Sequence, residues 1–304
     1  MKIDNSSRDS GDIISEGNVE VFGRSIYWKK YGVPEETKKL GTVLCLHGGP
    51  GLTHEYMLAF SELARFGYEV VFYDQLGCGK SELPKTKALF TIDRAIDEVE
   101  GVRRELKLGK IHILGNSYGG LLAIAYALKY ERNLKSLVSI SGIDSVPQTR
   151  VEIERMKWAL PKETTDVYAK YEENADYDNP EYQSALMVFY KKHFCRLKEW
   201  PKELLASLEH LSKDVYLTMN GPTEFAIIGN IRHWNVRSEL GRISLPSLVT
   251  CGKYDEVSPK VAREIHRGIK RSKFVMFEKS SHTAMWEERE KCSRVVRNFL
   301  RSVR

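Results

Sequence analysis

The sequence contains no apolar run of the roughly 18 to 20 residues that a membrane-spanning helix requires, and its first residues lack the apolar core of a signal peptide. We therefore expect a cytoplasmic location and no membrane partner. The sequence also has no internal repeat and no low-complexity segment. With 304 residues, 42% of them hydrophobic, the chain is expected to fold as a globular protein with a substantial core.

Cysteine is scarce, and the five cysteines are odd in number, far apart and mostly set in apolar runs. They are expected to be reduced and buried, without a disulfide framework or a zinc knuckle. The eight histidines include no His-Glu-x-x-His arrangement and no pairing with cysteines at ligand spacing. We therefore expect no metal site and no cofactor.

Positive charge is concentrated near the end of the chain. Residues 260–304 contain 13 lysines and arginines against 5 glutamates, a local excess of +8 in a chain of net charge +6. These basic residues recur at helical intervals, which is typical of the solvated faces of two surface helices. Phosphate binding is the less favoured interpretation, so no nucleic-acid partner is expected.

Short β-branched apolar runs alternate with amphipathic stretches along most of the chain. The predicted strands are 19–22 and 26–30, which form an opening hairpin, and then 42–46, 69–73, 110–114, 136–140, 246–251 and 273–277. Helices are predicted at 92–106, from Ser258 as N-cap with Pro259 in the first turn, and from about Ala284. This alternation predicts an α/β fold with a mostly parallel central sheet flanked by helices.

The alternation stops between about Asp144 and Leu240, where Tyr, Trp, Lys and Glu are frequent and the apolar period is helical. We predict that residues 145–240 form a helical cap inserted into a core of residues 16–144 and 241–304. Such a cap would cover the carboxyl edge of the sheet, where open α/β sheets bind ligands. Residues 1–15 are polar, and we expect them to be disordered or loosely attached.

Residues 115–119 read Gly-Asn-Ser-Tyr-Gly, between the apolar run 111–114 and the helix-like run 120–128. A serine on so tight a strand-to-helix turn needs small neighbours, because the turn strains its backbone and exposes its hydroxyl. The pattern predicts a nucleophile elbow with Ser117 as the nucleophile. The alternative at this point is a glycine-rich turn whose serine caps the following helix.

A serine nucleophile needs a base within hydrogen-bond reach and a carboxylate that orients the base. Asp255 follows the predicted strand 246–251, and His282 follows the predicted strand 273–277. The chain order Ser, Asp, His is that of α/β-hydrolases. Taken singly, Asp255 could be a turn former and His282 a solvated loop residue. Together they predict a triad of Ser117, Asp255 and His282.

The oxyanion that develops during acyl transfer needs hydrogen-bond donors. The backbone N–H of Tyr118 is one candidate. The second is expected from the loop 47–51, His-Gly-Gly-Pro-Gly, where Gly49 would let the backbone approach a substrate closely, although the loop could also be only a flexible turn.

Residues 77–81 end like a P-loop, but the first glycine of that motif would fall at Asp74, so nucleotide binding is not expected.

Three segments together resemble the proline iminopeptidases of the α/β-hydrolase superfamily, namely 47–51, 74–81 (Asp-Gln-Leu-Gly-Cys-Gly-Lys-Ser) and 115–120. The cap segment 219–225, Met-Asn-Gly-Pro-Thr-Glu-Phe, and the tandem Asp-Glu at 255–256 also look like the archaeal tricorn-interacting aminopeptidase branch of that family. The resemblance runs from about residue 18 to the end of the chain.

The resemblance implies that Glu224 and Glu256 bind the α-ammonium group of a substrate and place its first peptide bond over Ser117. It also implies a serine exopeptidase that releases an N-terminal residue, proline or another mainly apolar residue, from short peptides through an acyl-enzyme, with a larger protease complex as a further partner. From the residues alone, Glu224 could be a solvated cap residue and Glu256 a charge near a helix N-terminus.

Two other classes of function remain open from the sequence. A carboxylesterase, a lactonase or a carbon-carbon bond hydrolase would use the same triad on an uncharged substrate. A ligand receptor with little turnover would use the same fold without catalysis. The two glutamates separate these alternatives from a peptidase, because an ammonium site gives little benefit to a neutral ester.

Overall fold

The computed structural model describes residues 13–32 and 39–303. Within these residues the chain forms an eight-stranded sheet of β1 (Ile13–Val21), β2 (Arg24–Tyr31), β3 (Gly41–Leu46), β4 (Tyr68–Tyr73), β5 (Ile111–Asn116), β6 (Leu134–Ile140), β7 (Ser247–Gly252) and β8 (Ser272–Phe277). The strand order is β1-β2-β4-β3-β5-β6-β7-β8, in which β2 pairs antiparallel with β1 and β4 and the remaining pairs are parallel. The predicted fold class is confirmed.

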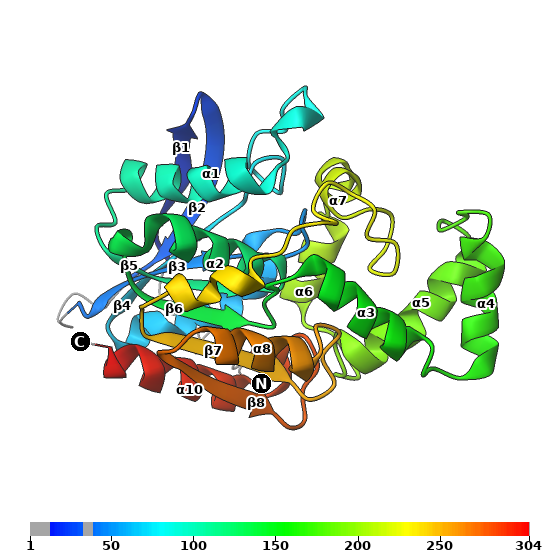
Figure 1. The fold of residues 1–304 in the computed structure, drawn as a ribbon. Helices are drawn as coiled ribbons and strands as arrows, with labels where there is room; N and C mark the ends of the chain where they lie inside the picture. The colour runs from blue at the N-terminus through cyan, green and yellow to red at the C-terminus, as the bar shows by residue number, and fades with distance from the viewer. Residues whose placement is uncertain (1–12, 33–38, 304) are drawn as a thin grey trace, which may run out of the picture.

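Helices cover both faces of the sheet, which is why the central strands are continuous apolar runs. Every residue of β3, β5 and β7 is buried. One face packs against α1 (Ile92–Glu105), α2 (Tyr118–Tyr130) and α8 (Pro259–Gly268), as Figure 1 shows. The other face packs against the 3-10 helix η2 (His54–Phe66) and α10 (Arg289–Ser302). The sheet is therefore a rigid support for the loops at its edge.

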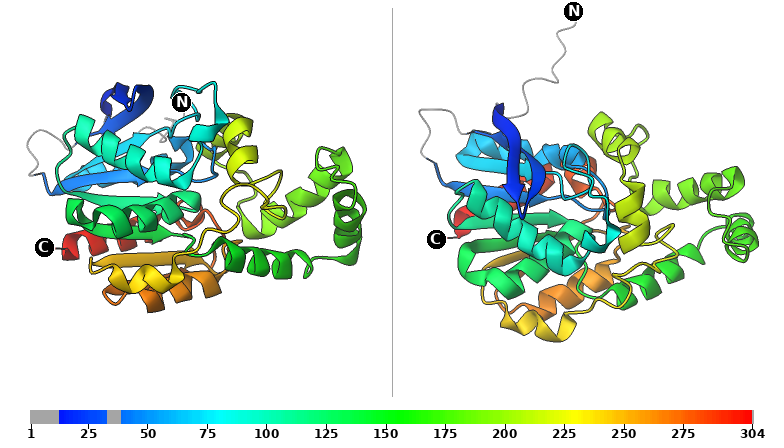
Figure 2. Two further views of the ribbon diagram at one scale, coloured as in Figure 1. Left: turned by 45° about the horizontal axis from the view of Figure 1, so that its top comes forward. Right: turned by 90° about the horizontal axis from the view of Figure 1, so that it is seen from above.

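Five further helices lie between β6 and β7 in the sequence and project beyond one end of the strands (Figures 1 and 2). They are α3 (Val146–Lys157), α4 (Lys162–Glu172), α5 (Pro180–His193), α6 (Lys202–Glu209) and α7 (Lys213–Met219). The chain enters and leaves this unit side by side, because Val146 N–H donates to Trp234 O and Val236 N–H donates to Asp144 O, both at 2.9 Å. The guanidinium of Arg237 also pairs with Asp144 at 2.7 Å. These contacts at Asp144 form a short stem, made of two adjacent chain segments, that connects the helices to the sheet.

Some local expectations differ from the structure. β1 begins at Ile13, so residues 13–15 are strand residues rather than part of the loose N-terminal segment, because Ile13 pairs with Tyr31 in β2. The rest of that segment, residues 1–12, lies outside the described residues. Ser258 stands at the N-cap of α8 as predicted, but its hydroxyl makes no capping bond and donates to Glu152 in α3 at 3.3 Å.

The last predicted helix is divided into α9 (Ala284–Glu287) and α10. Helices α8 and α10 carry most of the basic residues of 260–304, on faces opposite their buried residues.

All five cysteines are buried and free, as expected. None of the helices that the structure describes combines the length and the apolar composition needed to cross a bilayer.

Candidate active site

Ser117 lies on a sharp turn between β5 and α2. Its φ is 59° and its ψ is −126°, a positive-φ conformation that residues other than glycine rarely adopt. A Cβ atom on Gly115 would lie 2.0 Å from the carbonyl oxygen of Gly119, and one on Gly119 would lie 2.2 Å from that of Leu46. Only glycine fits at these two positions, which accounts for the small neighbours in the sequence pattern.

The hydroxyl of Ser117 is not committed to the helix that follows. The residue occupies the N-cap position of α2, but its side chain makes no capping hydrogen bond. The alternative interpretation of a serine that caps the helix is therefore wrong. Ser117 instead lines a cavity that His282 also lines.

Asp255 and His282 form a buried pair at the ends of β7 and β8. The Nδ1 atom of His282 donates to Asp255 Oδ1 at 2.7 Å. The aspartate also accepts hydrogen bonds from Ser141 Oγ at 2.5 Å, Gly252 N at 3.2 Å and Val257 N at 2.9 Å. Four donors fix the carboxylate, so the carboxylate in turn fixes the orientation and tautomer of the imidazole.

The cavity has a volume of about 550 Å³ and contains most of the predicted site. Ser117, His282, Gly49, Glu224 and Glu256 all line it. Much of the remaining wall is apolar or aromatic and comes from the inserted helices and the segment between α5 and α6, with Ile153, Leu186, Met187, Tyr190, Phe194, Trp200, Tyr216 and Leu217 among its residues. Within the described part of the chain, no group of three or more His, Cys, Asp or Glu side chains is arranged to hold a metal ion.

Two predicted site residues do not line the cavity. Asp255 is fully buried and reaches it only through His282. Tyr118 has its side chain in the core cluster with α1 and α2, so only its backbone can serve the site. As the first residue of α2, Tyr118 has an N–H group without a partner inside the helix.

Two carboxylates in the cavity pair with no lysine or arginine in the described part of the chain. The hydroxyl groups of Tyr190 and Tyr216 donate to Glu224, that of Tyr216 at 2.8 Å. Burial raises the pKa of both tyrosines well above its usual value, so both hydroxyls remain donors. The Oε2 atom of Glu256 is buried and has no hydrogen-bond partner. Among the described residues, neither glutamate forms an ion pair with a lysine or an arginine, so the cavity has an uncompensated acceptor for a cation.

These negative charges change the proton affinity of the imidazole. The Nε2 atom of His282 lies 3.6 Å from Glu256 Oε1. Burial alone would lower the pKa of His282, but the carboxylates of Asp255 and Glu256 outweigh it and raise the pKa to about 9. Burial, together with Glu224 and Asp255, raises the pKa of Glu256, while the charge of His282 lowers it. Because the two groups lie 3.6 Å apart and interact, the negative cavity favours one bound proton in this pair, on the imidazole.

The loop 47–51 packs directly against the serine turn. A Cβ atom on Gly48 would lie 2.8 Å from the Cβ of Ser117. The N–H of Gly48 donates to the hydroxyl of Tyr56 at 2.7 Å, and this hydroxyl donates to Asn116 Oδ1 at 2.9 Å. Gly49, with φ of 111°, is the glycine of this loop that lines the cavity. The N–H of Gly48 is thus used within the protein, which leaves Gly49 as the candidate donor to a substrate.

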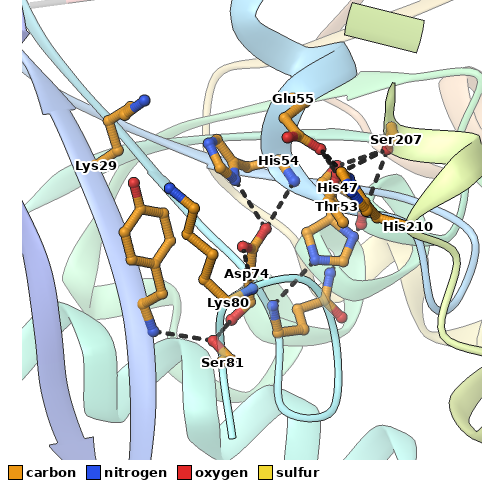
Figure 3. Close-up of polar contacts among 12 residues, drawn as sticks. Lys29, His47, Thr53, His54, Glu55, Asp74, Lys80, Ser81, Ser207 and His210 are labelled. Atoms are coloured by element: carbon orange, nitrogen blue, oxygen red, sulfur yellow. Dashed lines mark hydrogen bonds and ion pairs between the residues drawn. The ribbon is translucent and has the colours of Figure 1, made fainter. Parts of the chain in front are cut away.

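The segment that ends like a P-loop supports this loop (Figure 3). The Oδ1 atom of Asp74 accepts hydrogen bonds from the N–H and from Nδ1 of His54, both at 2.8 Å. The N–H of Gln75 donates to Nε2 of His47 at 3.0 Å, and Gln75 Nε2 donates to His47 O at 2.8 Å. Burial lowers the pKa of His47 to about 4, so its ring is neutral and can accept this bond. Residues 74–81 therefore hold both ends of the segment 47–54.

The inserted helices rest on the same segment. The N–H of Thr53 donates to Ser207 Oγ at 3.0 Å, and Ser207 Oγ lies 3.1 Å from Thr53 O (Figure 3). The N–H of Ser212 donates to Gly51 O at 2.8 Å. The loop that carries Gly49 is thus fixed between the sheet on one side and helices α6 and α7 on the other.

Four residues of the site were not assigned a role from the sequence, namely Tyr56, Ser141, Tyr190 and Tyr216. Ser141 directly follows β6, at the edge of the parallel sheet where the site lies. Its position in the sequence could therefore have identified it as a site residue. The three tyrosines have no such signal, because their partners are distant in the sequence or depend on how the inserted helices pack.

Comparison with known proteins shows the family to which the chain belongs. A family model for the alpha/beta hydrolase fold matches residues 41–289. The chain is 45% identical over 292 residues to the proline iminopeptidase of Saccharolobus solfataricus, an alignment that covers 95% of this chain and 93% of the relative. It is 44% identical over 288 residues to the proline iminopeptidase of Thermoplasma volcanium, with 94% and 96% covered. The chain belongs to the proline iminopeptidase family.

Two solved structures superpose closely on this chain. The crystal structure of a proline iminopeptidase from Mycobacterium smegmatis has a TM-score of 0.88 at 30% identity and covers 94% of this chain and 98% of its own. The crystal structure of VinJ has a TM-score of 0.92 at 31% identity, with 96% and 100% covered. The family resemblance stated from the sequence is confirmed, and its archaeal branch agrees with the two archaeal relatives.

Proposed function

We propose that this chain is a serine exopeptidase that releases the N-terminal residue of short peptides, proline or another mainly apolar residue. The observation that carries the proposal is that Glu224 and Glu256, without a lysine or arginine partner among the described residues, share one cavity with Ser117 and His282. The α-ammonium group of a peptide supplies the positive charge that the buried carboxylate of Glu256 and the half-buried carboxylate of Glu224 need. The names of the most similar relatives support the same activity.

In the proposed reaction Ser117 attacks the carbonyl carbon of the first residue. His282 accepts the serine proton at Nε2 and then donates it to the leaving amine, while Asp255 orients the ring. The N–H groups of Gly49 and Tyr118 donate to the developing oxyanion. Water then attacks the acyl-enzyme, with His282 as the base, and releases the amino acid.

The two glutamates would determine which peptide bond reaches the serine. When the ammonium group is held by Glu224 and Glu256, only the first carbonyl lies within reach of Ser117. The enzyme would therefore cleave the peptide bond after the first residue only. The apolar and aromatic wall of the cavity favours an apolar first side chain. We also propose that residues 145–240 act as the cap of a core made of residues 16–144 and 241–304, and the stem at Asp144 supports this division.

The alternatives receive less support. A carboxylesterase, a lactonase or a carbon-carbon bond hydrolase would gain little from two carboxylates beside a neutral substrate. Structures of such enzymes, including an esterase from Exiguobacterium antarcticum with a TM-score of 0.66 and 23% identity, share only the fold with this chain. A non-catalytic receptor would have no need of the four donors that fix Asp255 behind His282. Docking on a larger protease complex stays a prediction.

The test is Ser117→Ala, assayed on proline and alanine arylamides beside Ser184→Ala, which changes an exposed serine of α5. We expect kcat/KM to fall by about 10⁴-fold or more for Ser117→Ala, because loss of the nucleophile leaves only the oxyanion site and binding. Ser184→Ala should retain full activity. Wild-type turnover by Ser117→Ala would contradict the proposed mechanism.

A substrate panel separates the peptidase from the esterase. Amino-acid arylamides and short peptides should be cleaved only when their amino group is free, and N-acetylation should abolish cleavage because it removes the ammonium charge. Equal cleavage of acetylated and free substrates, or better cleavage of simple esters than of arylamides with no effect of the amino group, would favour the esterase alternative.

A further inference from the structure

The imidazole of His282 lies between two carboxylates that come from consecutive residues. On one side Nδ1 donates to Asp255 Oδ1 at 2.7 Å, and on the other side Nε2 lies 3.6 Å from Glu256 Oε1. The second distance is within ion-pair range but is too long for a good hydrogen bond. Nε2 is the atom that must accept the proton of Ser117, so the carboxylate of Glu256 faces the reactive nitrogen.

The charged groups that act most strongly on the ring are all carboxylates. Asp255 and Glu256 come from the loop after β7, and Glu287 of α9 acts from the side of β8. The charge of Glu224 acts in turn on Glu256, and Glu224 accepts hydrogen bonds from the tyrosines of α5 and α7. Lys213 also lines the cavity, but in the described part of the chain its ammonium group pairs with none of these carboxylates.

We propose that Glu256 holds the imidazole of His282 as an imidazolium in the free enzyme and that the ammonium group of the substrate releases it. An imidazolium already carries a proton at Nε2 and cannot accept another from Ser117. When the substrate ammonium binds Glu256, it neutralises the charge that stabilises this proton and adds a repulsive positive charge nearby. The proton then leaves to water, and neutral Nε2 becomes available as the base.

This coupling rests on the proposed function, because it takes the ammonium group as the ligand of Glu256. It adds a second level of selection to that function. A neutral acyl compound that enters the cavity would leave His282 protonated, so it would be discriminated against at the chemical step as well as in binding. By linkage, an ammonium ligand should bind more tightly as the pH rises through the pKa of His282, until the ligand itself loses its proton.

The experiment is an NMR titration of the histidine side chains in the Ser117→Ala variant, which cannot turn over the ligand. We expect the pKa of His282 in the free variant to lie at least about one unit above the ordinary value for histidine, which is tenfold in proton affinity. Saturation with L-prolinamide should lower the pKa by at least about one unit. N-Acetylprolinamide, which has no ammonium group, should leave it unchanged.

Two variants in the same background identify the responsible carboxylate. Glu256→Gln should lower the pKa of His282 in the free protein by about one unit or more and should abolish the response to prolinamide. Glu278→Gln, which changes an exposed carboxylate in the loop after β8, is the matched control and should change neither value. The titration with prolinamide needs only Ser117→Ala, so it decides the issue even if Glu256→Gln does not fold.

The outcomes distinguish this proposal from the proposed function. Two results would overturn the proposal that the substrate ammonium releases the proton of His282. One is an ordinary pKa of His282 in the free protein, and the other is a pKa that does not change when prolinamide demonstrably binds in the cavity. If prolinamide does not bind at all, the proposed function fails, and the release step is overturned with it. A raised pKa that falls on binding of prolinamide and depends on Glu256 supports both.

Discussion

The backbone N–H of Gly48 donates to the hydroxyl of Tyr56 at 2.7 Å. The same hydroxyl donates to Asn116, the residue before the proposed nucleophile, so one buried side chain joins the loop of Gly49 to the serine turn. The distance between the two proposed oxyanion donors therefore depends on this tyrosine, although its hydroxyl makes no step of the proposed reaction.

The first prediction concerns Tyr56→Phe. The change leaves the N–H of Gly48 buried without a partner, which should cost about 1–3 kcal/mol in the free energy of unfolding. We expect kcat to fall by about 10- to 100-fold with little change in KM, because misplaced donors weaken transition-state binding only. Tyr130→Phe, at the end of α2 and outside the cavity, is the control for both measurements. A normal kcat in Tyr56→Phe would show that the loop holds its place without this hydroxyl.

A second prediction addresses recognition of the amino end. Glu224→Gln should raise KM for proline arylamide by about 10-fold or more, which corresponds to the loss of one charged contact. Hydrolysis of p-nitrophenyl acetate, which has no ammonium group, should change by less than about threefold. Glu163→Gln, an exposed carboxylate of α4, should affect neither substrate. Equal losses on both substrates would mean that Glu224 supports the cavity rather than binding the amine.

A third prediction concerns the serine turn itself. In Gly119→Ala the new Cβ would lie 2.2 Å from a backbone oxygen of β3, and neither side of this contact can move easily. We expect a loss of about 3 kcal/mol or more in unfolding free energy, together with loss of labelling by a fluorophosphonate serine probe. Gly17→Ala is the control, since its Cβ would lie 3.9 Å from the nearest atom, an ordinary contact. Wild-type stability in Gly119→Ala would contradict the close approach of α2 and β3.

The fourth prediction is a pH dependence of stability that arises far from the cavity. Burial raises the pKa of Glu98 from an ordinary 4.5 to about 7, although a hydrogen bond from Leu76 N and the charge of Arg94 oppose the rise. The folded chain thus holds a proton that the unfolded chain has lost between these two values, so stability falls as the pH rises through this window.

Glu98→Gln should remove that dependence. At pH 8 we expect the variant to be more stable than the wild type by about 1–3 kcal/mol, and at pH 4 the two should be nearly equal. Urea unfolding at both pH values measures this difference, with Glu105→Gln as an exposed control on the same helix. A wild type whose stability relative to Glu98→Gln does not vary with pH would show that folding does not shift the pKa of Glu98.

The sequence was sufficient to predict the sheet and the positions of the proposed triad, for a physical reason. Buried parallel strands are continuous apolar runs, and the residues after them are brought to one edge of the sheet. Asp255 and His282 could therefore be assigned to the same edge as Ser117 from the strand pattern alone. Strand ends were less certain, as the six additional strand residues at 13–18 show.

What could not be predicted depends on contacts between distant segments. Tyr56 lies in a 3-10 helix for which the sequence predicted no element, and its partner Asn116 is sixty residues away. The segment 74–81 could be excluded as a P-loop from its spacing, but its support of His47 and His54 depends on tertiary packing. Likewise Ser258 was predicted correctly at the start of a helix, but its hydroxyl donates to Glu152 instead of capping the helix.

Strands β6 and β7 are hydrogen-bonded neighbours, although five helices separate them in the sequence. Because the inserted unit begins and ends at almost the same point, the sheet closes in the same way whatever the length of the insertion. Evolution can thus exchange or remodel the segment as a block while the strands that carry the nucleophile, the base and the acid stay paired. Chimeras that graft the inserted helices of a relative between Asp144 and Arg237 should accordingly fold, and they offer a route to new substrate preferences where the contacts of Thr53 and Gly51 with the insertion are kept.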